Sequence, residues 1–165
     1  MPEAAYYGTL GITDNEEAPM DERPMLICYD GSEDATRAID KAVELLGERQ
    51  AVVVDVAPPF TAEEAFATIA AVTPIFEEQN VEAAAAVAEQ GAAHARALGL
   101  IAKPRADLAA PTWEGVVAVA DDIDAAVIVI GSRGLTGVRE AVEGSLSHQV
   151  AEHAGRPVLI VPPSA

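Results

Sequence analysis

Segments of strand length alternate along this chain with longer segments of helical periodicity, and this alternation constrains the fold more than any other feature. The segments of strand length are Met25–Tyr29, Ala51–Val56, Ile101–Ala109, Ala125–Ile130 and Pro157–Val161. Half of the residues are hydrophobic but only 4% are aromatic, so Ala, Val, Ile and Leu must build the core, as in parallel strands covered by helices. In a chain of 165 residues, this pattern predicts one α/β domain with an open, doubly wound, five-stranded parallel sheet and helices on both faces.

Signals for helix and strand ends support this pattern. Ser32 is a good N-cap ahead of two acidic residues, and Gly47 stands where that helix should stop. A long helix is expected over Thr73–Leu98, and Thr112 is expected to cap the next one. Pro104 cannot donate a ladder hydrogen bond, so the third strand is predicted to lie at an edge of the sheet.

The charge of the chain is strongly acidic and unevenly distributed. The formal net charge is -17 at pH 7, and residues 131–165 are the neutral stretch, with three acidic and three basic residues. Nucleic-acid-binding proteins need a basic stripe, so no nucleic-acid partner is expected. The apolar runs are far shorter than the roughly 20 residues of a membrane span, and the first residues lack the basic region of a secretory signal. We therefore expect a cytoplasmic protein with no membrane association.

Residues 1–24 differ from the rest of the chain. They carry six acidic residues and one basic residue, together with two glycines and three prolines, and show no sustained period. Such a composition offers little apolar area to bury. We interpret 1–24 as an acidic, flexible N-terminal extension and 25–165 as the folded domain.

Two loops follow strand ends where a ligand would bind. In open parallel sheets, ligands collect beyond the carboxyl ends of the strands, where the strand order reverses. One such loop is Asp30-Gly31-Ser32, and the other runs from Gly131 to Ser145. The glycines of the second loop let backbone N–H groups approach phosphate oxygens, and Ser145 opens a helix whose N-terminus favours an anion. The loop is neither a Walker A motif nor a dinucleotide fingerprint, yet its composition predicts phosphate binding.

The spacing of this loop, Gly131-x2-Gly134-x9-Gly144-Ser145, resembles the nucleotide loop of the ATP-binding branch of the universal stress protein family. The resemblance extends over residues 25–163 and includes Asp30-Gly31-Ser32 after the opening strand. It implies the sheet order 3-2-1-4-5. It also implies ATP, or AMP or ADP, as the ligand, with or without Mg²⁺.

The resemblance assigns residues to parts of the nucleotide. The assigned residues are Asp30, Val56, Gly131, Arg133, Gly134, Gly144 and Ser145. Asp30 would lie near the ribose and adenine, and Val56 would offer backbone groups to the base, while the glycines and Ser145 would hold the phosphates. Arg133 is assigned to phosphate neutralisation, with a solvated surface charge as the open alternative. The sequence departs from the family at Asp55, where relatives often have His.

No catalytic set is evident, because Ser145 has no base and orienting acid in pattern with it. The histidines fall at helical positions without a cluster of ligand spacing, so no metal site is expected. The buried-strand neighbours of Cys28 predict a plain core thiol. The predicted function is an adenine-nucleotide-binding stress-response or regulatory module. A nucleotide-free interaction protein of the same fold and a slow ATPase remain the alternatives.

The apolar pattern of the last strand predicts that the protein pairs with a second copy of itself. Val158 and Ile160 face one side of a strand that would otherwise be an exposed apolar edge. The family resemblance points the same way. We therefore expect a homodimer joined through the Val158–Val161 strand.

Overall fold

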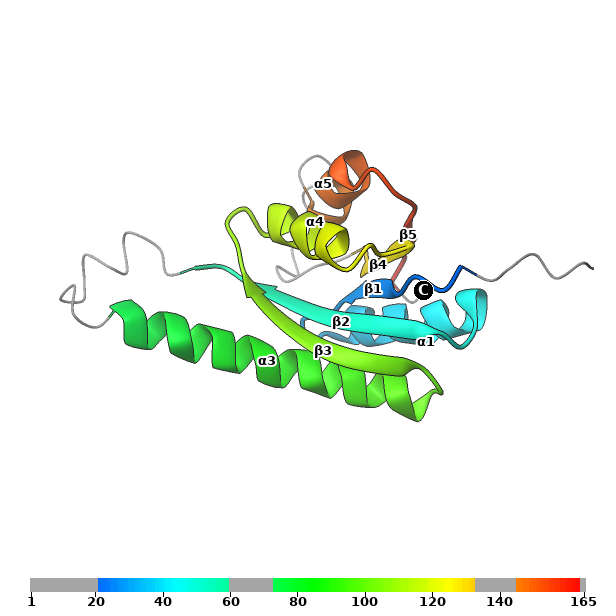
Figure 1. The fold of residues 1–165 in the computed structure, drawn as a ribbon, viewed down its shortest axis with the longest axis horizontal. Helices are drawn as coiled ribbons and strands as arrows, with labels where there is room; N and C mark the ends of the chain where they lie inside the picture. Colours follow the sequence, from blue (N-terminus) through cyan, green and yellow to red (C-terminus); the bar gives the residue numbers. More distant parts are fainter. Residues whose placement is uncertain (1–20, 60–72, 133–144, 164–165) are drawn as a thin grey trace, which may run out of the picture.

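The computed structural model describes residues 21–59, 73–132 and 145–163, in which strands and helices alternate (Figure 1). In chain order the elements are β1 (Met25–Cys28), α1 (Glu33–Leu46), β2 (Gln50–Ala57), α3 (Thr73–Ala97), β3 (Ile101–Leu108), α4 (Thr112–Asp122), β4 (Val127–Gly131), α5 (Leu146–His153) and β5 (Val158–Val161). Every segment predicted to be a strand is one, with small shifts at its ends.

The strands form one sheet in the order β3-β2-β1-β4-β5, and every neighbouring pair is parallel. β1 lies at the centre, where Ile27 stands opposite Val53 of β2 and Val129 of β4. Helices α1 and α3 cover one face, and α4 and α5 cover the other (Figure 1). The doubly wound α/β fold and its strand order are therefore confirmed.

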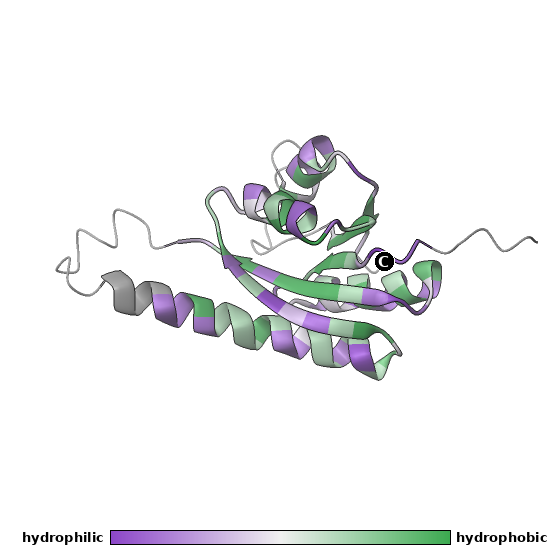
Figure 2. Cartoon of the chain, in the orientation of Figure 1, coloured by the Kyte–Doolittle hydropathy of each residue, from purple (hydrophilic) through white to green (hydrophobic). Residues whose placement is uncertain are grey.

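Apolar side chains fill both sides of the sheet. Ile27 and Val53 pack with α1 and α3, whereas Leu26 and Ile128 pack with α4 and α5. Because successive strand residues point to opposite faces, all four residues of β1 are buried. Figure 2 shows hydrophobic residues concentrated in the central strands and more hydrophilic ones along β3.

Helix α3 approaches the sheet closely at Gly91. A Cβ at this position would lie 2.6 Å from the ring of Tyr29 and 2.9 Å from Cγ1 of Val53. Glycine inside a helix costs about 1 kcal/mol relative to alanine. This cost is offset here by close packing of α3 over the end of β1.

The helix starts agree with the sequence at α1 but not at α4. Ser32 caps α1, since its Oγ accepts a hydrogen bond from the N–H of Ala35 at 3.1 Å, and Gly47 ends the helix as predicted. The prediction that Thr112 caps α4 is wrong by one residue. The N-cap is Pro111, which makes no side-chain cap, and Thr112 is the first helical residue. Proline replaces the expected polar cap because its fixed φ suits the extended conformation of an N-cap.

β3 and β5 are the two edges of the sheet. Pro104, in β3, lies opposite Val53 of β2, so the prediction of an edge strand there is confirmed. At the other edge, the side of β5 that carries Ile160 is open, and this isoleucine is 40% exposed.

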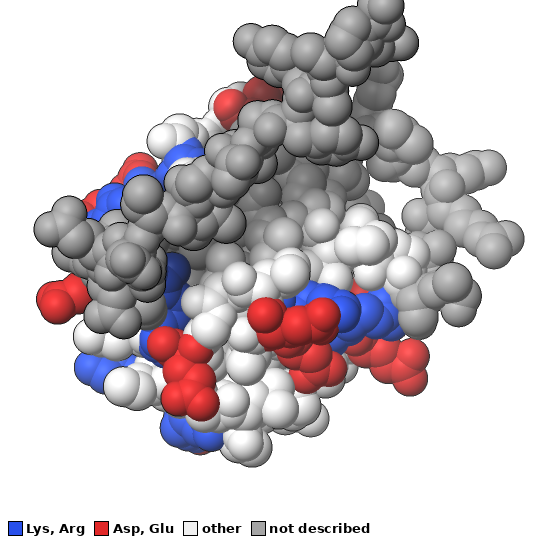
Figure 3. Space-filling model, turned by 90° about the vertical axis from the view of Figure 1, so that its right-hand side faces the viewer, with Lys and Arg blue, Asp and Glu red and all other residues white. Residues whose placement is uncertain are grey.

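Several arginines in the described residues pair with carboxylates. Arg23 lies 2.6 Å from Asp21. Arg156 pairs with Asp121 and also donates to backbone carbonyls of α4 and the turn after it. Figure 3 shows acidic and basic side chains beside one another on one face of the molecule. Within the described residues, none of the helices has both the length and the hydropathy that a bilayer span requires.

Candidate functional site

A cleft of about 410 Å³, partly open to solvent, lies beyond the carboxyl ends of β1, β2 and β4. The strand order reverses between β1 and β4, which is where open α/β sheets bind ligands. The lining residues are Cys28, Tyr29, Asp30, Ala35, Val54, Asp55, Val56, Thr112, Val116, Ile130, Gly131 and Leu146.

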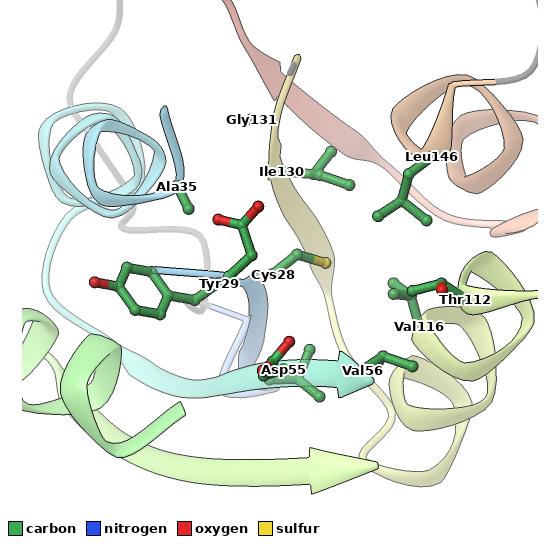
Figure 4. Close-up of a pocket in the computed structure, with 12 residues that line it drawn as sticks. Cys28, Tyr29, Ala35, Asp55, Val56, Thr112, Val116, Ile130, Gly131 and Leu146 are labelled. Atoms are coloured by element: carbon green, nitrogen blue, oxygen red, sulfur yellow. The ribbon is translucent and has the colours of Figure 1, made fainter. Parts of the chain in front are cut away.

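The walls of the cleft are mainly apolar. In Figure 4, Val116 and Thr112 of α4 and Leu146 of α5 stand on one side, while Tyr29 and Ala35 stand on the other. Val116 is 1% exposed, so it forms a fixed surface. A slot of this kind suits a flat ring, because a ring buries apolar area on both of its faces.

Asp30 lies in the turn between β1 and α1. Its Oδ1 accepts a hydrogen bond from the N–H of Ser32 at 2.9 Å, and Gly31 between them has a φ of 81°. This turn fixes the carboxylate at the end of β1. A carboxylate has about four acceptor positions, so Asp30 keeps acceptor capacity for ligand hydroxyl groups.

Gly131 ends β4 against the first turn of α1. A Cβ at this position would lie 3.2 Å from the carbonyl oxygen of Asp34, tighter than an ordinary contact. The N–H of Ser132 donates to the carbonyl of Val161 at 2.8 Å, which directs the chain beyond the strand end. Glycine therefore lets β4 and the N-terminus of α1 meet at the cleft.

Ser145 is the N-cap of α5, as the sequence predicted for a helix opening there. Its Oγ accepts a hydrogen bond from the N–H of His148 at 3.3 Å and lies 3.2 Å from Oγ of Ser147. The next residue, Leu146, lines the cleft. The N-terminus of α5 thus begins at the edge of the cleft.

The structure brings together part of the set that the sequence assigned. Asp30, Val56 and Gly131 line the same cleft. Ser145 directly precedes a lining residue, as described above. The remaining assigned residues, Arg133, Gly134 and Gly144, lie outside the described residues.

Sequence reasoning missed the wall made by α4 and α5. Thr112, Val116 and Leu146 come from separate helices, and only the packing of those helices over the sheet brings them together. No local pattern marks such residues as lining a site. Asp55 also lines the cleft. An acidic residue near the end of a buried strand is unusual, so its position could have marked it as a site residue.

The polar part of the cleft is acidic. Burial, together with a smaller effect of the negative charge of Asp30, raises the pKa of Asp55 from its ordinary value of 3.8 to about 6. Burial also raises the pKa of the Cys28 thiol to about 12, with smaller effects from both aspartates. The thiol therefore stays protonated and unreactive at neutral pH. No Lys, Arg or His is among the described residues that line the cleft.

The described side chains that line the cleft are suited to binding a small molecule. In this part of the chain, no group of three or more His, Cys, Asp or Glu residues is placed to hold a metal ion. The lining offers two carboxylates, two hydroxyl groups and a largely apolar surface. These groups can hold a flat, hydroxylated small molecule.

Comparison with known proteins identifies the family. Residues 22–162 match the model of the universal stress protein family. The chain belongs to this family. Universal stress protein YxiE of Bacillus subtilis (strain 168) is 29% identical to it over 147 residues, which is 83% of this chain and 97% of that relative.

Solved structures share the universal stress protein fold of this chain. The hypothetical protein MJ0577 has a TM-score of 0.71 and 23% identity, covering 87% of this chain and 98% of its own. A universal stress protein in complex with cAMP has a TM-score of 0.59 and 23% identity, with coverages of 86% and 98%. One from Archaeoglobus fulgidus, in complex with dAMP, has a TM-score of 0.57 and 22% identity, with coverages of 84% and 97%.

Proposed function

We propose that this universal stress protein binds an adenine nucleotide, ATP in particular, in the cleft at the ends of β1, β2 and β4. The observation that carries the proposal is that Asp30, Val56 and Gly131, assigned to the nucleotide from sequence, line one cleft. Two proteins of similar fold support it, because one is described in complex with cAMP and the other with dAMP.

The base and the ribose occupy the described part of the site. The adenine ring enters the apolar slot beside Val116 and Leu146, and Val56 offers backbone groups to its edge. Asp30 accepts hydrogen bonds from the ribose hydroxyls. Because the N–H of Ser32 already holds this carboxylate, little side-chain entropy is lost when the sugar binds.

The phosphates extend toward the loop after β4. Gly131, Gly134 and Gly144 present backbone N–H groups to them, with Ser145 at the N-terminus of α5 and Arg133 as a neutralising charge. Residues 131–165 are neutral within a chain of net charge -17, so an anion meets less repulsion there. Mg²⁺ accompanies ATP, held mainly by phosphate oxygens and water.

The nucleotide acts as a regulatory ligand of a cytoplasmic stress-response protein. Binding stabilises the conformer that holds nucleotide, by ordinary linkage. Hydrolysis is at most slow, because the described lining has no base paired with a nucleophile. The pairing of arginines with carboxylates supports a protein with no nucleic-acid partner, and we infer no membrane partner either.

The functional unit is a homodimer joined through β5. This strand is an edge of the sheet, and Ile160 is 40% exposed on it. Pairing with a second copy would cover an apolar edge that otherwise invites uncontrolled association.

Mass spectrometry of small molecules released from the purified, denatured protein tests the nucleotide proposal. We expect an adenine nucleotide in near-stoichiometric amount, or binding of added ATP by the nucleotide-free protein. Release of no nucleotide, together with no ATP binding at millimolar concentration, would contradict the proposal. That result would favour the nucleotide-free interaction protein.

A further inference from the structure

Two carboxylates meet at the cleft from neighbouring strands. Asp30 follows β1, and Asp55 is the third residue from the end of β2. Both residues line the cleft between the strand ends and the helices. Asp55 and Val56 are neighbours near the end of β2, and both line the cleft (Figure 4). The pair is therefore placed where the proposed ligand would remove water from both side chains.

The side of the sheet that Asp55 occupies is apolar. Residues two apart in a strand point to the same face, so Asp55 shares the face of Val53, which packs against α3 near Gly91. The residues of α3 that are buried against the sheet are Ala84, Ala88, Gly91, Ala92 and Ala95. No described residue of this buried set offers Asp55 a positive charge or a hydrogen-bond donor from its side chain.

Among the described residues, Asp30 is the charged group that raises the pKa of Asp55. On β3, its register partner is Ala106, so the adjacent Arg105 and Asp107 point to the opposite face. The other groups are exposed or paired in the described residues: Glu82 and Glu89 on α3, Glu114 on α4, and Asp34, which pairs with Arg37, on α1. On β1, Cys28 is neutral at physiological pH.

We propose that Asp55 makes ligand binding in this cleft proton-linked: the protein takes up a proton at Asp55 when an anionic nucleotide binds, so affinity rises as the pH falls. This inference rests on the proposed function and deepens it. It assigns to Asp55 the control of affinity by pH.

The direction of this pH dependence follows from the effect of a bound ligand on the pKa of Asp55. In the free protein, burial and Asp30 already hold the pKa of Asp55 at about 6. A bound nucleotide excludes more water and brings negative charge, and both effects disfavour the ionised carboxyl. The pKa is then higher in the complex than in the free protein, so binding takes up protons. Affinity should rise as the pH falls toward about 6 and level off below it. The total gain in affinity is about tenfold for each unit by which the bound ligand raises the pKa of Asp55.

Calorimetric titration with cAMP tests this inference. A phosphate monoester has a second pKa of about 6, which would overlap with Asp55, whereas the diester of cAMP has no second ionisation. We expect wild-type affinity to be about three- to tenfold higher near pH 5.5 than near pH 8. At an intermediate pH, buffers of different ionisation enthalpy should report net proton uptake.

Two variants identify the group responsible. Asp55→Asn should bind cAMP with little dependence on pH, and near pH 8 it should bind more tightly than wild type. Glu82→Gln removes one negative charge on the exposed surface of α3 and should keep the wild-type pH profile. This control separates Asp55 from the general acidity of the chain.

The outcomes distinguish this inference from the proposed function. Binding of cAMP with an affinity that is independent of pH, or that rises with pH, would overturn the inference alone. A pH profile that survives in Asp55→Asn would also overturn it. Failure of cAMP, ATP and adenosine to bind at any pH would overturn the proposed function and this inference with it.

Discussion

The half-buried carboxyl of Asp55 should make the wild-type protein less stable at neutral pH than a variant without that charge. Burial and Asp30 raise the pKa of Asp55 from 3.8 to about 6. Each pKa unit corresponds to about 1.4 kcal/mol, so full burial would give about 3 kcal/mol. Asp55 is only half-buried, and solvent screening reduces the expected penalty to about 1–2 kcal/mol.

The sign of the effect depends on pH. The stability associated with the neutral carboxyl is fully present below pH 3.8 and is lost as the pH rises through about 6. Asp55→Asn removes this loss, because an amide does not ionise. The variant should therefore be more stable than wild type near pH 7.5, by about 1–2 kcal/mol, and the difference should shrink to about half near pH 5.

Thermal and urea unfolding of the nucleotide-free protein measure this difference. For a chain of this size, the gain corresponds to an increase in Tm of about 2–8 °C near neutral pH. Glu82→Gln, on the exposed surface of α3, should change stability little at either pH. An Asp55→Asn variant that is equally stable or less stable than wild type near pH 7.5 would refute the assignment of Asp55 as a half-buried, uncompensated charge.

Three further predictions concern packing, assembly and the phosphate loop. Gly91→Ala should lower the free energy of unfolding by about 1–3 kcal/mol in urea denaturation, despite the better helix propensity of alanine. Its Cβ would lie 2.6 Å from the ring of Tyr29, and unchanged stability would contradict the close packing of α3. Ile160→Lys should shift the protein from dimer to monomer in light scattering at micromolar concentration; an unchanged dimer mass would count against the β5 interface. Gly144→Val should weaken ATP binding by at least about tenfold in calorimetry and adenosine binding much less, whereas equal losses would mean that the loop does not hold phosphates.

The fold could be predicted from the sequence because its signals are local. Alternating strand and helix patterns, the cap at Ser32 and the proline in β3 each act within a few residues and agree with one another. The sheet order came from the resemblance to a family. At α4 the local signal misled, since a threonine beside a proline satisfies two rules for a helix start, and Pro111 took the N-cap.

Only part of the site could be predicted in the same way. Asp30 and Gly131 belong to turns at strand ends, which sequence marks directly. Val116 and Leu146 reach the cleft through the packing of α4 and α5 over the sheet, and no sequence pattern encodes that contact. The ionisation of Asp55 also escaped prediction, because it depends on what surrounds the carboxyl group in space.

Calorimetric titration of a variant that fills the cleft tests the central claim most directly. Leu146 lines the cleft at the start of α5, and Leu146→Trp should occupy the space proposed for the adenine ring. Leu45→Trp makes the same change at a position that is 61% exposed on α1, outside the cleft. The account predicts that Leu146→Trp loses at least about tenfold in affinity for both ATP and adenosine, while Leu45→Trp binds both like wild type. Wild-type affinity in a folded Leu146→Trp variant would contradict the placement of the nucleotide in this cleft.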